Sequence, residues 1–133
     1  MSWEVLHGKT IESVWADKGG YYIKFVTTEG EEFTWMAVGD CCAHAFVNSY
    51  EGINDLFGSE VTKVVVSGVT TVTTDDIGDY DVVDTEWIRF HNKWGESLVL
   101  ELRTEHNGYY GGWLEPATKE PDVEMLCVGP TEE

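Results

Sequence analysis

Apolar and polar side chains alternate along most of the first third of the chain. In residues 9–15, 21–26 and 33–36, large apolar side chains recur at every second position, and Gly30 lies in the connection between the second and third runs. A period of two with a glycine-containing connection is typical of antiparallel strands joined as a hairpin. The N-terminal third is therefore predicted to form a sheet.

The second half of the chain repeats this pattern. Residues 86–90 and 97–103 flank the turn-like segment 92–95, and three leucines at alternate positions of the later run form one apolar face. This is a second hairpin signal. Residues 61–74 are rich in β-branched side chains, and Gly68 within them predicts a bulge or bend.

One segment breaks the alternation and favours a helix. Asp40 is a good N-cap, and residues 41–50 contain neither proline nor glycine. The apolar side of this helix would consist of Ala45, Phe46 and Tyr50. We therefore expect an α+β fold, in which a curved antiparallel sheet carries one main helix packed on it.

The 133 residues suit a single domain spanning residues 1–133. An apolar content of 42% excludes a wholly disordered acidic chain. Within the domain we expect an exposed acidic loop at about residues 75–86 and an irregular C-terminal part at about residues 116–133, with a short last strand over residues 123–128. No internal repeat or second domain is indicated.

The net charge limits the classes of function that this protein can have. The chain has 25 acidic and 8 basic residues, which gives a formal net charge of −17. Direct binding to nucleic acid is disfavoured, because the phosphates would repel such a surface. The charge is explained either by a well-solvated surface or by a surface that competes with nucleic acid for a basic groove on a partner. The chain shows no signal peptide and no apolar run that could span a membrane, so a cytoplasmic location is expected.

Cysteine usage does not indicate a disulfide framework. The three cysteines are Cys41, Cys42 and Cys127, an odd number in a chain without a secretion signal. A bridge between the adjacent Cys41 and Cys42 would be strained. Reduced thiols are therefore expected.

The stretch GDCCAHAF suggests a zinc site formed by Cys41, Cys42 and His44. On a helix, Cys41 and His44 are neighbours on one face, and a helix N-terminus favours the thiolate that zinc requires. A structural zinc has four ligands, so one more would be needed. The distant candidates are His7, His91, His106 and Cys127. Two alternatives stay open: a buried small cysteine with a surface histidine, and a catalytic thiol activated by His44.

Trp94 is the aromatic residue most suited to binding a partner. It lies in the turn of the second predicted hairpin, where it is exposed unless the chain covers it. An exposed tryptophan beside charged residues is a common anchor in protein interfaces. The alternative is a turn tryptophan folded back on its own sheet.

Four short motifs occur together in this chain. They are an LxGKTI-like start (Leu6, Gly8, Lys9, Thr10, Ile11), GDCC (Gly39 to Cys42), a glycine and leucine element (Gly52, Leu56, Gly58) and NGYYGG (Asn107 to Gly112). The combination resembles a family of small, functionally uncharacterised proteins of bacteriophages and prophages. The resemblance implies the same α+β fold and a phage or prophage origin, and it supplies no activity.

A small acidic phage-type protein is also similar in class to inhibitors of bacterial defence systems, including anti-CRISPR proteins. This similarity suggests a non-enzymatic inhibitor of a host defence nuclease, with a Cas9-type CRISPR effector as the candidate target and a structural zinc ion. The residues expected to contact the partner are Asp75, Asp76, Asp79, Asp81, Asp84, Glu86 and Trp94. The alternatives are a small metal- or thiol-dependent enzyme centred on Cys41, Cys42 and His44, and an accessory structural protein of the phage.

Overall fold

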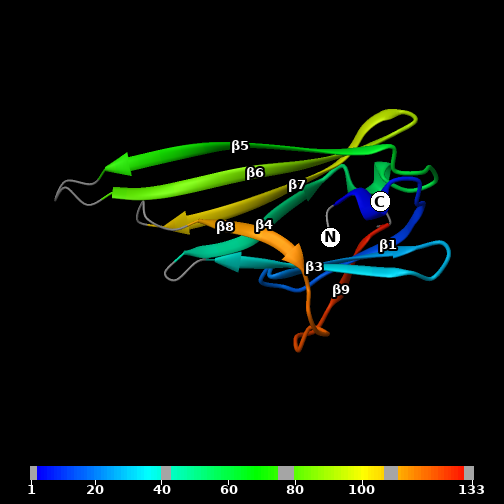
Figure 1. Cartoon of the computed structure of the whole chain (residues 1–133), viewed down its shortest axis with the longest axis horizontal. Helices are drawn as coiled ribbons and strands as arrows, with labels where there is room; N and C mark the ends of the chain where they lie inside the picture. The colour runs from blue at the N-terminus through cyan, green and yellow to red at the C-terminus, as the bar shows by residue number, and fades with distance from the viewer. Residues whose placement is uncertain (1–2, 40–42, 75–79, 107–110, 131–133) are drawn as a thin grey trace.

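The chain folds into two antiparallel sheets that face one another (Figure 1). The computed structural model describes residues 3–39, 43–74, 80–106 and 111–130. Its elements are the 3-10 turn η1 (Trp3–Leu6), β1 (Ile11–Ala16), β2 (Tyr22–Thr27), β3 (Glu32–Gly39), β4 (His44–Glu51), the 3-10 turn η2 (Ile53–Asp55), β5 (Lys63–Thr74), β6 (Tyr80–Asn92), β7 (Gly95–His106), β8 (Gly112–Pro116) and β9 (Leu126–Gly129). The order is β8-β3-β2-β1-β9 in one sheet and β4-β7-β6-β5 in the other.

The two predicted hairpins are confirmed, and they belong to different sheets. β2 and β3 pair from Tyr22 opposite Met36 to Val26 opposite Glu32. β6 and β7 pair around a tight turn in which Asn92 lies opposite Gly95. The three leucines of β7 at positions 98, 100 and 102 are fully buried, as their alternation predicts.

The α+β prediction is wrong, because the segment expected to form the main helix is a strand. Residues from His44 onward form β4, which pairs with β7 from His44 opposite Glu105 to Glu51 opposite Val99. Ala45 and Val47 are buried, whereas Phe46 between them is only partly buried, which is the alternation of a strand. A favourable N-cap is a weak local signal, and pairing with a long neighbouring strand outweighs it.

An aromatic cluster joins the two sheets. Phe25 of β2 and Trp35 of β3 are fully buried and meet edge to face, with ring centroids 5.7 Å apart. Phe90 of β6 reaches Phe25 from the opposite sheet at 5.3 Å, and Trp3 of η1 stacks on Trp35 at 4.1 Å. Burial of each large ring stabilises the fold by about 2–3 kcal/mol, so this cluster is the centre of the core.

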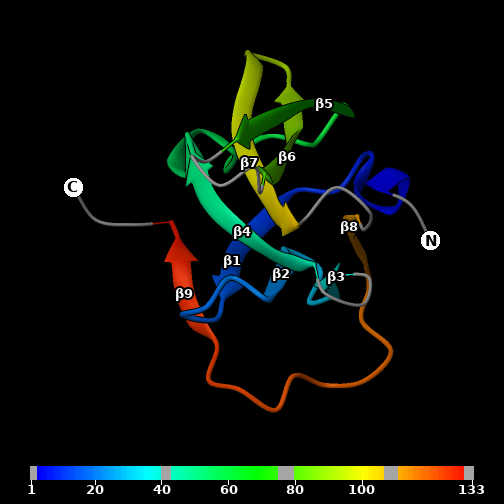
Figure 2. The same cartoon turned by 90° about the vertical axis from the view of Figure 1, so that its left-hand side faces the viewer.

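Three strands of the smaller sheet continue well beyond this core (Figure 1). We call their distal part the arm and define it as residues 68–74 of β5, 80–86 of β6 and 102–106 of β7. The end-on view in Figure 2 shows β5, β6 and β7 above the layer of β1, β2 and β3.

The prediction of an exposed acidic loop over residues 75–86 is wrong for residues 80–86, which belong to the arm. Residues 80–86 are part of β6, because their backbone pairs on both sides, with β5 and with β7. Residues 75–79 lie outside the described residues.

In the described C-terminal part, up to residue 130, the irregular segment lies between two strands. After β8 ends at Pro116, residues 117–125 have no regular structure, and Leu126–Gly129 form β9 beside β1. The predicted last strand is therefore present, shorter and shifted by a few residues. In the described part of the chain, neither 3-10 turn has the length and hydrophobicity that a membrane crossing requires.

Gly20 connects the β1–β2 turn to the other sheet. Its carbonyl oxygen accepts a 2.7 Å hydrogen bond from the backbone N–H of Val47 in β4. Gly20 has a φ of 76°, and a Cβ at this position would collide with the Val47 carbonyl oxygen. Asp17 supports the turn by accepting a 2.7 Å hydrogen bond from the N–H of Tyr22. Only glycine satisfies both the left-handed conformation and the close approach.

We predict that Gly20→Ala destabilises the fold far more than Gly30→Ala. Both glycines have positive φ, but nothing lies within 4 Å of a Cβ placed on Gly30. The left-handed conformation costs either variant about 1 kcal/mol, and the collision at Gly20 should add about 2 kcal/mol or more. Chemical denaturation of the two variants measures the difference in their free energies of unfolding. Equal losses of stability would contradict the importance of the close contact between Gly20 and Val47.

Candidate functional site

The inner face of the arm carries a cluster of hydrogen-bonded polar side chains. Asp84 of β6 accepts a 2.6 Å hydrogen bond from the hydroxyl of Thr70 in β5. Its other carboxylate oxygen lies 2.8 Å from Nε2 of His106 in β7. The imidazole is 7% exposed and the Asp84 side chain is 36% exposed, so the contact is shielded from water on the histidine side only. Three strands thus each contribute one member.

Strand register explains why these residues meet. Thr70 lies opposite Asp84, and Asp84 lies opposite Thr104, which is fully buried. His106 follows Thr104 on the same face, because side chains two apart in a strand point the same way. Continuing the inward-facing alternation of the second hairpin beyond its apolar part would have found this cluster. The sequence interpretation missed it because residues up to Glu86 were assigned to a loop.

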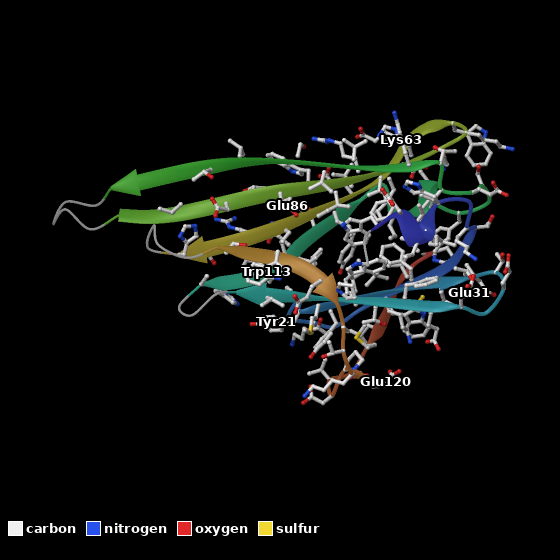
Figure 3. The ribbon with its side chains drawn as sticks, in the orientation of Figure 1. Tyr21, Glu31, Lys63, Glu86, Trp113 and Glu120 are labelled. Carbon is white, nitrogen blue, oxygen red and sulfur yellow. The ribbon has the colours of Figure 1, made fainter. Side chains whose placement is uncertain are left out.

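Glu86 lies next to this cluster, on the same face of β6 and nearer the core. Figure 3 shows it about midway along β6, beyond the packed aromatic rings. It borders a cleft of about 300 Å³ whose lining also includes Gly68, Thr70, Asp84 and Gly112. Burial raises the pKa of the Glu86 carboxyl above its ordinary value. No hydrogen bond or ion pair joins this carboxyl to another described residue. Among the described side chains of this face, Glu86 is thus a half-buried acid with no cation beside it.

The order of the contacts does not match a nucleophilic triad. In such a triad the histidine stands between the nucleophile and the acid. Here Asp84 stands between Thr70 and His106, so the imidazole is not placed to remove the Thr70 proton. The geometry is that of a carboxylate satisfied by two neighbours. The cluster can therefore hold the three strands of the arm in register.

Of the three predicted zinc ligands, the structure describes only His44. Cys41 and Cys42 lie outside the described residues. His44 begins β4, so the helical spacing that related it to Cys41 does not apply. Its Nε2 is 3.0 Å from the Tyr21 hydroxyl, and its ring packs 4.9 Å from that of Phe46. Among residues 3–39, 43–74, 80–106 and 111–130, no three His, Cys, Asp or Glu side chains are grouped to hold a metal ion.

Trp94 lies at the β6–β7 turn, and its side chain is 65% exposed. Its backbone N–H donates to the side-chain oxygen of Asn92, and the Lys93 ammonium lies 4.8 Å from its ring centroid. A second cleft of about 420 Å³ lies beside it, lined partly by Asp55 and Phe57. The exposure fits the predicted contact with a partner, which stays a prediction.

The acidic residues predicted to contact a partner do not form one exposed segment. Asp84 and Glu86 lie on the inner face of β6, where Asp84 is already paired. The side chain of Asp81 and the residues Asp75, Asp76 and Asp79 lie outside what the structure describes. The predicted loop conformation is therefore wrong for Asp84 and Glu86, because their backbone pairs on both sides within the sheet, whereas their contact with a partner stays a prediction.

We predict that Glu86→Gln stabilises the protein at neutral pH. Because the folded-state pKa is raised, the folded state holds the proton more tightly, and the stability linked to that proton is lost as pH rises through the folded value. Removing the charge should raise the free energy of unfolding at pH 7 by a few tenths of a kcal/mol to about 1 kcal/mol, after allowance for solvent screening. The gain should vanish below about pH 4, where Glu is protonated in both states.

Glu105→Gln is the matched control, because it removes one negative charge from an exposed position on the outer face of β7, where its nearest charged partner is the equally exposed His44, with Nδ1 at 3.9 Å. Thermal unfolding across pH compares the two variants. A gain at pH 7 that is equal in both variants would attribute the effect to net charge rather than to burial.

The chain was compared with protein families, with curated proteins and with solved structures. No curated protein and no solved structure matches it. A family model covers residues 4–114, which includes every strand from β1 to β7 and most of β8. That span contains the arm, its polar cluster and the Trp94 turn. The chain belongs to the family described as "Domain of unknown function (DUF7448)".

Proposed function

We propose that this protein is an acidic binding protein that occupies the basic, nucleic-acid-binding surface of a partner. The observation that carries the proposal is the net charge of −17 on a scaffold of two packed sheets. The expected partner is a nuclease of a host defence system, with a Cas9-type effector as the candidate target. Such nucleases have grooves lined by Lys and Arg, which an acidic protein can fill in place of DNA.

The few basic side chains strengthen the argument, because two of the eight are paired with carboxylates of the same chain. The Lys9 ammonium lies 2.7 Å from the Glu31 carboxylate, and Lys24 lies 2.9 Å from Glu32. These pairs leave a large surplus of carboxylates facing solvent. An excess of one sign accelerates encounter with an oppositely charged groove and makes binding sensitive to salt.

The enzymatic alternative has less support from the described residues. The His106–Asp84 pair has the wrong order for nucleophilic catalysis, and Nε2 of His44 is placed against the Tyr21 hydroxyl. A thiol centre at Cys41 and Cys42 stays a separate hypothesis, and selective alkylation of one cysteine with loss of an activity would favour it. An accessory structural role in a phage particle would instead appear as co-purification with virion components.

We predict that the purified protein competes with DNA for a Cas9-type effector and that inhibition weakens at least tenfold between about 50 and 300 mM salt. Neutralising Asp75, Asp76 and Asp79 to Asn should weaken inhibition further. The matched control neutralises Glu120, Asp122 and Glu124, which are exposed in the β8–β9 connection and change the net charge equally.

Cleavage assays and competition binding measure both effects. Equal losses in the two triple variants would show that only net charge matters and would remove the assigned contact residues. Failure to bind or inhibit any defence nuclease at low salt would overturn the target class.

A structural zinc ion bound by Cys41, Cys42 and His44 is a further part of the proposal. We predict about one zinc per chain in protein purified without chelator, lost in Cys41→Ser/Cys42→Ser together with several degrees of thermal stability. Mass spectrometry of the intact protein and metal analysis measure the content. Zinc-free wild-type protein with unchanged stability would end this hypothesis.

A further inference from the structure

β5 presents a long edge that no described strand covers. It lies at the end of the order β4-β7-β6-β5 and pairs only with β6. The pairing runs from Lys63 to Thr74 without a shift in register, so the bulge predicted at Gly68 is absent. Unpaired N–H and C=O groups along such an edge accept a further strand.

The sequence of β5 lacks the features that usually protect an edge. After Lys63 it contains no charged residue and no proline, and most of its residues are β-branched. Val65, Val66 and Val69 are 41–50% exposed. Natural edge strands are commonly blocked by charges, prolines or bulges, so an unblocked edge of this length indicates a docking function.

Gly68 opens a path from this edge to Glu86. Gly68 lies directly opposite Glu86 in the β5–β6 ladder, and both line the cleft on the inner face of the arm. Because Gly68 has no side chain, nothing of β5 stands between the Glu86 carboxyl and the open edge at this level. On its other side Glu86 lies opposite Leu102, which is buried and apolar.

We propose that an extended segment of a basic partner protein pairs with β5 as a fifth strand and places a Lys or Arg side chain across Gly68 onto the Glu86 carboxylate. The partner strand would lie two strand spacings from β6, about 10 Å. A Glu and an Arg side chain together span this distance. The proposal rests on the acidic binding function above and names the segment that this part of the protein recognises.

The charge distribution favours this occupant over a second copy of the chain. Two copies would each carry −17 and would repel at close approach. A second β5 has only Lys63 as a cation, at one end of the strand, so it could place a cation opposite Gly68 only in a shifted register that leaves about half of each strand unpaired. A basic segment supplies the cation that Glu86 lacks, and the raised pKa of this acid agrees with an unmatched charge.

The test uses a labelled peptide of about nine alternating Thr and Val residues with one central Arg. The control peptide has citrulline in place of Arg, because citrulline has nearly the shape of Arg without its charge. We expect the Arg peptide to bind the whole protein at least about tenfold more tightly, a typical value for a partly buried charge pair. Fluorescence anisotropy measures the affinities. Hydrogen exchange should show new protection at alternate amides of β5, because only every second residue of a strand points its N–H to the free edge.

Matched variants separate the pairing from general charge effects. Glu86→Gln should abolish the preference for Arg over citrulline, whereas Glu105→Gln on the outer face should preserve it. Gly68→Thr should weaken binding of the Arg peptide by closing the path, whereas Ser67→Thr, on the opposite face of the same strand, should not. Gly68 does not have positive φ, so the substitution does not force a left-handed backbone, but its Cβ would lie 3.2 Å from the Thr85 carbonyl oxygen, so the stability of this variant is measured beside its affinity.

Several results would overturn the inference. They are an unchanged preference in Glu86→Gln, a lack of protection in β5, and a dimer in sedimentation that protects β5 in the absence of peptide. The inference and the proposed function can fail separately. Nuclease inhibition without peptide binding would remove only the β5 site, and peptide binding without inhibition of any nuclease would remove only the target class.

Discussion

Contact among Trp3, Phe25, Trp35 and Phe90 is the interaction on which the two-layer arrangement depends. Phe25 and Trp35 come from the five-stranded sheet, Phe90 comes from the four-stranded sheet, and Trp3 closes the cluster from η1. Neither sheet can bury its apolar face alone, and no long helix covers either one in the described chain. The stacked and edge-to-face rings therefore set the spacing of the sheets and the position of the core.

This core occupies only one end of β5, β6 and β7, and the rest of these strands forms the arm. Away from the aromatic cluster, the described inner face of the arm carries polar side chains beside the buried Val82 and Leu102, and its acids are satisfied unequally. Asp84 has two neighbours, whereas Glu86 faces a cleft between Leu102 and the bare backbone of Gly68. A polar inner face is tolerated there because part of it stays open to water.

Long-range and short-range forces would have different roles in this protein. The net charge acts over a Debye length of about 8 Å at physiological salt and can steer a basic partner without specifying how it docks. An open strand edge acts only at hydrogen-bond distance, but it fixes direction and register. Together they would give fast encounter and a defined complex, with the hydrogen-bonded cluster around Asp84 keeping the edge straight.

Local patterning determined a large part of this structure. The alternation in residues 21–36 and 86–103 was sufficient to predict both hairpins and the buried leucine face, because a period of two depends only on neighbouring residues. The net charge was also readable from the composition. Trp94 was correctly expected in a turn, since the flanking strands leave no other place for it.

Only the tertiary structure decided the identity of β4 and the candidate site. His44–Glu51 has a helix-like start, and it becomes a strand because β7, far later in the chain, offers a complementary edge. Asp84 and Glu86 read locally as part of an acidic loop, and pairing of β6 with both β5 and β7 turns them inward. The open path beside Gly68 likewise exists only in the assembled sheet. Each of these features depends on partners distant in sequence, whose pairing free energy no local window of residues contains.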